Sequence, residues 1–138
     1  MARTVRDAMT EHPRTLELDA TIVDAARAMR DADVGIVPVV EGDRLEGVIT
    51  DRDIAVRVVA GGGDPNATHV RDAMSPKIVT IDPDQDLDEA MRLMAEHQVR
   101  RLPVCEEDGR LVGVLAQADV AEHGDEARTG ETVQQISR

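Results

Sequence analysis

The chain has no phenylalanine, tyrosine or tryptophan among its 138 residues. Its hydrophobic core must therefore consist of Val, Ile, Leu, Met and Ala side chains, and a planar ligand would have to be held between aliphatic groups. A single cysteine, Cys105, excludes an internal disulfide, and we expect it to be a small buried hydrophobic residue in a strand. The histidines, at positions 12, 69, 97 and 123, have no short ligand spacing, so no metal site is expected.

Positive charge is scarce as well. The chain carries 16 Lys and Arg against 28 Asp and Glu, for a net charge of -12, and Lys77 is its only lysine. This balance argues against nucleic acid and anionic membranes as partners. The chain starts without an apolar signal segment and contains no stretch that could span a bilayer, so we expect a cytoplasmic location.

The sequence also lacks a recognisable catalytic arrangement. There is no Ser-His-Asp, Cys-His or nucleophile-elbow pattern, so we expect no enzyme activity. Acidic pairs such as Asp82/Asp84 and Glu106/Glu107 fall in expected turns, and we interpret them as solvated loops.

The chain does contain one sequence pattern twice. Val-Arg-Asp-Ala-Met at residues 5–9 returns at residues 70–74, and the later motifs follow in the same order. A period of about 65 residues is too long for common solenoid repeats and too short for two independent domains. It predicts two half-domains related by a pseudo-twofold axis, with equivalent clefts between them. We place the first repeat at residues 1–63, the second at 64–122 and a C-terminal tail at 123–138.

Each repeat is expected to form strand, helix, strand, strand, helix. The first predicts a helix around residues 22–29, strands over 34–40 and 45–50, and a helix over 51–59. The second predicts a strand near 78–81, a helix over 87–96, strands over 99–104 and 111–115, and a helix over 117–122. Pro38 suits an edge position or a strand end. The fold class is α/β (α+β), with the sheets packed together and the helices outside.

Ordered motifs carry a resemblance to a known family. Each repeat has a Met-Ser/Thr opening and a hydrophobic-Pro-Val strand, and the first closes on Gly47-Val48-Ile49-Thr50-Asp51-Arg52-Asp53. Over roughly residues 5 to 122 the chain resembles a pair of cystathionine-β-synthase (CBS) domains, a Bateman module. Its Gly-Val-x-Thr-Asp-Arg-Asp-Ile motif and its Gly-Gly-Asp-Pro-Asn connector resemble those of small stand-alone bacterial stress- or hypoxia-response proteins. The resemblance implies a regulatory sensor that binds an adenosine-containing ligand, such as AMP, ADP or ATP, between the repeats and requires no cofactor.

Thr50 and Asp53 carry the sharpest site hypothesis. In the family the matching hydroxyl and carboxylate lie where a strand meets a helix, and the resemblance implies that Asp53 accepts hydrogen bonds from both ribose hydroxyls. Thr-x-x-acid before a helix is also a capping box, which needs no ligand. Asp119 keeps the acid in the second repeat although Ala116 has lost the hydroxyl, and this favours a ligand role. Arg52 could contact phosphate or pair with its neighbouring aspartate.

The resemblance also implies the rest of this nucleotide site. Adenine would lie against Ile78 and Val79, with Val48 opposite, and the phosphates would face Arg101 and Arg100. Neighbouring residues in a strand point to opposite faces, which favours Arg101. In so acidic a chain, two adjacent arginines can equally be surface charge balance.

A mirror-image site is expected to be weaker. It would use Asp119 with Leu16 and Ile36, and it lacks both the hydroxyl and the basic pair. It is therefore expected to be empty or to select an uncharged ligand.

The expected helix over residues 51–59 predicts a homodimer. Ile54, Ala55, Val58 and Val59 offer more apolar surface than one half-domain should leave in water. The alternative to a nucleotide sensor is a ligand-free stress-response dimer that acts as a protein-interaction module. Under both hypotheses we expect no effector domain in the chain, so an unidentified effector protein is a possible partner.

Overall fold

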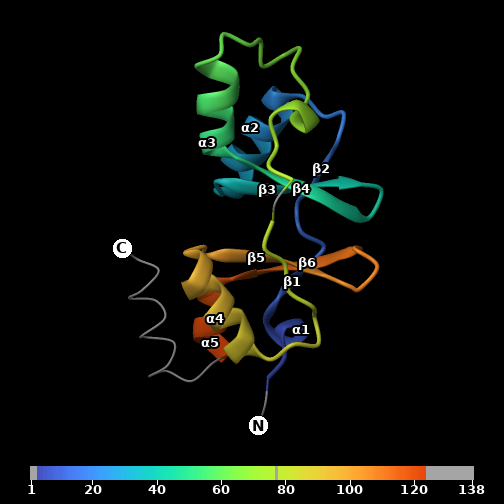
Figure 1. Ribbon diagram of the computed structural model, residues 1–138, viewed down its shortest axis with the longest axis vertical. Helices are drawn as coiled ribbons and strands as arrows, with labels where there is room; N and C mark the ends of the chain where they lie inside the picture. The colour runs from blue at the N-terminus through green and yellow to red at the C-terminus, as the bar shows by residue number, and fades with distance from the viewer. Residues whose placement is uncertain (1–2, 77, 124–138) are drawn as a thin grey trace. The chain divides into compact units, whose positions relative to one another are not determined.

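The computed structural model describes residues 3–76 and 78–123, which form two compact units (Figure 1). Unit 2 spans Arg14–Ile78, whereas unit 1 combines the residues before it with those from Val79 onward. The predicted C-terminal tail lies outside the described residues, apart from its first position. Each unit is a small mixed α/β structure built on one three-stranded sheet.

Unit 2 contains the predicted strand-helix-strand-strand-helix order of the first repeat. Its elements are β2 (Leu16–Glu17), α2 (Ile22–Ala32), β3 (Ile36–Glu41), β4 (Arg44–Thr50), α3 (Asp51–Asp53), η1 (Ile54–Val59) and η2 (Val70–Asp72). The strand order is β2-β3-β4, with β2 parallel and β4 antiparallel to β3. Together α3 and η1 confirm the helix predicted over 51–59. Its second part is wider than an α-helix, because the Ala60 N–H donates to the Ala55 carbonyl, five residues back, at 2.9 Å.

Pro38 lies in the middle of the central strand, and not at an edge or an end as expected. The short β2 pairs only with Val39 and Val40 of β3, so the missing N–H of Pro38 falls beyond that ladder. Across β4 its partner is Val48, whose own N–H donates to the Ser75 carbonyl at 3.1 Å. No ladder hydrogen bond is therefore lost at this proline.

Unit 1 contains α1 (Val5–Ala8), β1 (Thr10–Glu11), α4 (Leu87–His97), β5 (Arg101–Cys105), β6 (Leu111–Ala116) and α5 (Gln117–His123). The strand order is β1-β6-β5, and all pairing between these strands is antiparallel. The strand predicted near 78–81 is reduced to one parallel bridge between Ile81 and Val104. The chain turns immediately afterwards, where the Gln85 N–H donates to the Asp82 carbonyl at 3.2 Å, so pairing cannot continue.

The compact units differ from the sequence repeats, because the opening segment of each repeat packs on the sheet of the other. We call residues 5–11 and 70–75 the lead-in segments. The first pairs with β6 of unit 1 through Thr10 and Val114. In unit 2, Ser75 exchanges two hydrogen bonds with Val48 of β4, of 2.8 and 3.1 Å.

Two glycines make room for these lead-in segments. A Cβ atom on Gly47 would lie 2.7 Å from the Ser75 carbonyl oxygen. A Cβ atom on Gly113 would lie 2.6 Å from the Met9 sulfur and 2.8 Å from the Thr10 carbonyl oxygen. The glycine that opens each Gly-Val motif is therefore required by the close approach of another backbone.

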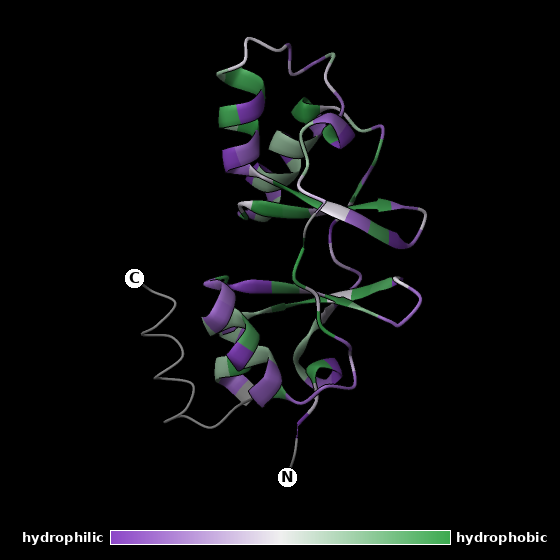
Figure 2. Cartoon of the chain, in the orientation of Figure 1, coloured by the Kyte–Doolittle hydropathy of each residue, from purple (hydrophilic) through white to green (hydrophobic). Residues whose placement is uncertain are grey.

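Each unit has its own aliphatic core, as the absence of aromatic residues predicts. Figure 2 shows apolar strands and hydrophilic hairpin ends in both sheets. The fully buried core residues include Ile22, Val37, Val39, Ile49 and Val70 in unit 2, and Val5, Met94, Leu102, Val104 and Leu115 in unit 1. Each such side chain contributes about 1.5–3 kcal/mol through burial.

Cys105 ends β5 and is partly buried, close to the expected small hydrophobic residue in a strand. Burial raises the pKa of its thiol to about 11. The thiol is therefore protonated at neutral pH, and it is a poor nucleophile and metal ligand in that form.

Candidate functional site

The junction between β4 and α3 holds Thr50 and Asp53 in a complete capping box. The Asp53 N–H donates to Thr50 Oγ1 at 3.0 Å, and the Thr50 N–H donates to Asp53 Oδ2 at 2.9 Å. Asp53 is only 8% exposed, and among the described residues it is the one charged residue that is buried. A carboxylate in this position is fixed by the fold before any ligand arrives.

The second carboxylate oxygen of Asp53 has a different environment. Asp53 Oδ1 lies 3.7 Å from Nε of Arg57, a distance too long for a hydrogen bond. The cap therefore uses Oδ2, while Oδ1 keeps lone pairs for an incoming donor. The two functions weighed from the sequence do not compete for the same atom. The sequence analysis does not identify Arg57, although its spacing of four residues from Asp53 on a helix is a signal for an ion pair.

The equivalent junction of unit 1 explains why an acid persists without the hydroxyl. The Ala116 N–H donates to Asp119 Oδ2 at 3.0 Å, which is the carboxylate half of the same box. Asp119 thus has a structural reason to be present even though position 116 offers no side-chain acceptor. Its persistence does not by itself favour a ligand role for Asp53, contrary to the sequence argument.

The strand register aligns Arg100 and Arg101 of the second repeat with Gly35 and Ile36 of the first. Ile36 pairs with Thr50 across β3 and β4, and Arg101 pairs with Ala116 across β5 and β6. The Gln117 N–H donates to the Arg100 carbonyl at 2.8 Å, as the Asp51 N–H does to the Gly35 carbonyl at 2.9 Å. Arg100 is exposed and Arg101 half-buried, and within the described residues neither guanidinium group has a recorded partner.

Position 35 is a glycine where the second repeat has an arginine, and the side chain nearest to it is the exposed Asp51. A Cβ atom on Gly35 would lie 3.0 Å from Oδ2 of Asp51. At this junction the basic pair lies in unit 1, whereas the complete Thr-Asp box lies in unit 2.

The remaining predicted site residues fall in both units. Unit 2 holds Val48, which is 7% exposed, together with the half-buried Ile78 and the exposed Arg52. Val79 belongs to unit 1 and packs against its core. The backbone N–H of Arg52 donates to Asp51 Oδ1 at 2.8 Å, and its guanidinium has no recorded partner among the described residues.

Of the residues predicted for the weaker site, Leu16 is the least open. It is 9% exposed and contributes to the unit 2 core, and it pairs with Val39 as Ile81 pairs with Val104. Its counterpart is therefore Ile81, a core residue, rather than Ile78. Ile36 is half-buried in β3.

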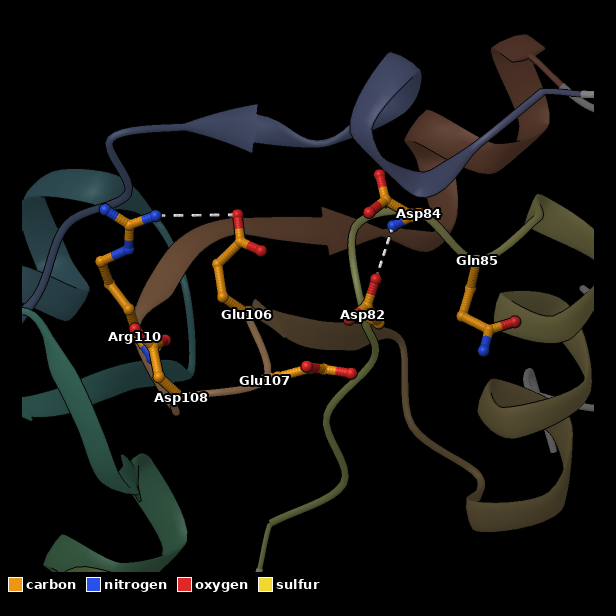
Figure 3. Close-up of a pocket in the computed structure, with 7 residues that line it drawn as sticks. All are labelled: Asp82, Asp84, Gln85, Glu106, Glu107, Asp108 and Arg110. Carbon is orange, nitrogen blue, oxygen red and sulfur yellow. Dashed lines mark hydrogen bonds and ion pairs between the residues drawn. The ribbon is translucent and has the colours of Figure 1, made fainter.

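The acidic pairs form a hollow in unit 1 of about 740 Å³ (Figure 3). Asp82, Asp84, Glu106, Glu107 and Asp108 line it, together with Gln85 and Arg110. The Asp84 N–H donates to Asp82 Oδ1 at 2.8 Å, a turn-stabilising contact. Within the described ranges, no group of three His, Cys, Asp or Glu side chains is arranged to hold a metal ion.

Two α+β repeats with matching strand–helix junctions define a tandem-repeat protein of the kind that the sequence motifs indicated. The profile of the CBS domain matches residues 5–60 and 70–126. The chain therefore belongs to the CBS domain family. No helix in the described residues has the length and apolar character that crossing a bilayer requires.

Two curated relatives cover most of the chain. The CBS domain-containing protein YhcV of Bacillus subtilis is 44% identical over 117 residues, which are 85% of this chain and 82% of the relative. Hypoxic response protein 1 of Mycobacterium tuberculosis is 39% identical over 121 residues, which are 87% of this chain and 84% of the relative.

Solved structures show the same fold. Hypoxic Response Protein I, crystallised with two coordinated zinc ions, superimposes with a TM-score of 0.80 at 38% identity, covering 89% of this chain and 100% of that chain. CBSX2 in complex with AMP superimposes with a TM-score of 0.72 at 26% identity, covering 98% of each chain. The chain is thus similar to one CBS protein that holds zinc and to another that holds AMP.

Proposed function

We propose that this chain is a regulatory module that binds an adenosine-containing nucleotide of the AMP, ADP or ATP type, with Asp53 as the ribose ligand. The observation that carries the proposal is the arrangement of Asp53, whose carboxylate is held by the Thr50 N–H through Oδ2 and keeps Oδ1 without a hydrogen bond. The AMP complex of CBSX2 supports the ligand class. An ionised oxygen with free lone pairs matches the two donors of a vicinal diol.

The other predicted residues have complementary roles in this proposal. Arg101, with Arg100 beside it, supplies positive charge for phosphate, since a guanidinium fork matches phosphate geometry. Val48, Ile78 and Val79 supply aliphatic surface for adenine, because the chain has no aromatic side chain on which a base could stack. Arg52 is exposed and also available for phosphate. The weaker site around Asp119 does not contribute to nucleotide affinity.

Calorimetric titration with AMP tests the proposal, and Asp53→Asn is the sharpest variant. The amide oxygen can still accept from the Thr50 N–H, so the cap persists while the ionised acceptor is lost. We expect AMP affinity to fall about tenfold or more, the cost of a charge-assisted hydrogen bond. Asp119→Asn, the matched control in unit 1, should leave affinity unchanged. Equal losses in the two variants, or no AMP binding by the parent chain, would contradict the proposal.

The module acts through another protein and not as an enzyme. The relationship to Hypoxic response protein 1 supports a role in a stress response. In this proposal the nucleotide is a signal and no cofactor is required, and the effector protein is a separate partner in the cytoplasm.

A second candidate function, protein interaction through a homodimer, is favoured by the outer face of η1. Val56 and Val59 are 52% and 63% exposed, whereas Val58 is buried and Ile54 packs against the unit 2 core. The exposed pair therefore differs from the set expected from sequence, in which Val58 counted as outward-facing and Val56 was missed. In an isolated chain these two valines would leave apolar surface in contact with water, and a dimer that packs through this helix would bury it.

Light scattering tests this dimer. The parent chain should show twice the chain mass of 15.0 kDa at micromolar concentration. Val59→Glu should give the single-chain mass, since a buried unpaired carboxylate opposes association. Arg71→Glu, an exposed change on η2, is the control and should keep the double mass. A parent chain that stays single at every concentration would exclude the dimer.

A further inference from the structure

A second pocket of unit 1 lies between the first lead-in segment and the β5–β6 hairpin. Its volume is about 370 Å³, within the range of small-ligand sites. Met9 and Pro13 line it from one side, and Leu111 and Val112 from the other. These side chains give the pocket an aliphatic wall.

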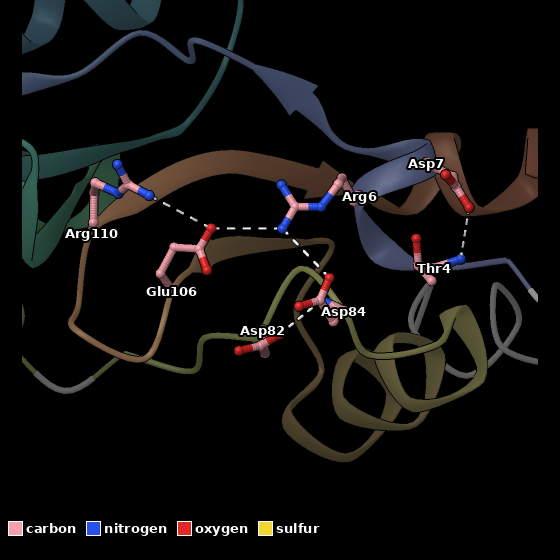
Figure 4. Close-up of polar contacts among 7 residues, drawn as sticks. All are labelled: Thr4, Arg6, Asp7, Asp82, Asp84, Glu106 and Arg110. Atoms are coloured by element: carbon pink, nitrogen blue, oxygen red, sulfur yellow. Dashed lines mark hydrogen bonds and ion pairs between the residues drawn. The ribbon is translucent and has the colours of Figure 1, made fainter.

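Two arginines, Arg6 and Arg110, and two glutamates, Glu11 and Glu106, place both charges in this pocket, and His12 also lines it. Figure 4 shows Glu106 between the two arginines. Nη2 of Arg6 and Nη2 of Arg110 lie 3.6 and 3.8 Å from the same oxygen, Glu106 Oε1. Arg6 Nη2 also contacts Asp84 Oδ1 at 3.5 Å. These contacts are longer than the 2.7–2.9 Å typical of a guanidinium–carboxylate pair, so each fork can engage a further anion.

The surroundings disfavour a ligand with net negative charge. Glu106 and Arg110 also line the acidic hollow, which carries five carboxylates. A ligand that brings its own cationic group avoids this repulsion, because Glu106 can accept from it. Charge of both signs beside an aliphatic wall therefore matches a zwitterion with an aliphatic side chain.

The equivalent positions of unit 2 do not reproduce this combination. The strand register places Glu46 where unit 1 has Val112, so a carboxylate replaces part of the aliphatic wall. Arg71, Glu41 and Arg44 match Arg6, Glu106 and Arg110, yet no ion pair joins them among the described residues. The pocket is a property of unit 1 and not of the repeat.

We propose that this pocket binds an aliphatic α-amino acid. The ligand carboxylate pairs with Arg6 and Arg110, its ammonium group pairs with Glu106, and its side chain packs on Met9, Leu111 and Val112. The bound amino acid joins the lead-in segment to the β5–β6 hairpin and thereby stabilises unit 1.

Calorimetric titration with L-leucine tests the proposal, with two analogues that each lack one charge. The parent chain should bind leucine with a saturating signal below about 10 mM. 4-Methylpentanoate lacks the ammonium group and 3-methylbutylamine lacks the carboxylate, and each should bind about tenfold more weakly or worse. Equal binding of either analogue, or no saturating signal with leucine, would overturn the proposal.

Matched substitutions locate the site. Arg110→Gln should weaken leucine binding about tenfold or more, whereas Arg44→Gln, at the equivalent position of unit 2, should leave it unchanged. Val112→Glu, which installs the unit 2 residue, should also abolish binding by placing a carboxylate in the aliphatic wall. Circular dichroism confirms that each variant is folded. Leucine binding that survives both Arg110→Gln and Val112→Glu would place the ligand elsewhere and overturn the assignment.

Discussion

The strand–helix junctions of the two units differ in several side chains, among them one hydroxyl and a pair of arginines. In unit 2, Thr50 and Asp53 close a reciprocal capping box, whereas in unit 1 only the carboxylate half remains, from Asp119 to Ala116. Unit 1 in turn carries Arg100 and Arg101, where unit 2 has a glycine and an isoleucine. The acid is common to both because the helix start needs it. What distinguishes the two junctions is therefore the set of residues around the acid.

The helices that follow these junctions also differ. In unit 2 the helix widens into η1 and leaves Val56 and Val59 exposed, whereas in unit 1 Val120 of α5 is 2% exposed. Both helices close the core of their own unit, through Val58 in unit 2 and Val120 in unit 1, and the helix of unit 2 presents apolar surface as well. A repeat that is duplicated in sequence has acquired two different outer surfaces.

Among the variants that test the comparison of the two units, we expect the largest loss of stability at Gly47 and Gly113, the glycines next to the lead-in segments. Gly47→Ala and Gly113→Ala should each lower the free energy of unfolding by about 1–3 kcal/mol, because the added Cβ overlaps a lead-in segment. Urea unfolding followed by far-ultraviolet circular dichroism measures this in a chain without aromatic residues. Asp43→Ala, in the exposed β3–β4 turn, is the control and should change stability by less than about 0.5 kcal/mol. A loss confined to one glycine would show that only one lead-in segment is tightly packed.

Much of the fold could be predicted because periodicity and repetition are local signals. Helices α2 and α4 and both hairpins follow from the spacing of apolar residues and from turn residues. The exchange of lead-in segments between the repeats could not be predicted, since it depends on long-range pairing such as Thr10 with Val114. The strand predicted near residues 78–81 is only a bridge at Ile81, because a turn that begins at Asp82 ends the pairing.

Part of the candidate site could be predicted from the sequence. The correspondence of Arg101 with Ile36 could be predicted, because an alignment of two repeats conveys register. The different environments of the two carboxylate oxygens of Asp53 could not be predicted, since they depend on the distances to Thr50 and Arg57. The burial of Leu16, a residue that the resemblance assigns to the weaker site, could not be predicted, because the apolar pattern alone does not say which face of a two-residue strand is buried.

The difference in arginines predicts a difference in ligand preference. Arg101→Ala should weaken AMP binding about tenfold while sparing adenosine, because only the phosphate uses a guanidinium partner. Asp53→Asn should weaken both ligands, since both carry the ribose diol. Parallel calorimetric titrations with AMP and adenosine measure this. If Arg101→Ala binds AMP as tightly as the parent chain does, or loses as much affinity for adenosine as for AMP, Arg101 does not bind phosphate. The arginine would then contribute only to the surface charge, and the interaction-module function would be favoured.

The smallest predicted effect concerns the hydroxyl itself. Thr50→Ala removes the acceptor of the Asp53 N–H and should lower the free energy of unfolding by about 1 kcal/mol. Ala116→Thr supplies the missing acceptor in unit 1 and should raise it by about 0.5 kcal/mol. Valine has the shape of threonine without the hydroxyl, so Thr50→Val and Ala116→Val separate the hydrogen bond from packing and strand propensity. Urea unfolding of the four variants gives the values. If Ala116→Thr and Ala116→Val are equally stable, the added hydroxyl forms no cap, and the half box of Asp119 already satisfies the start of α5.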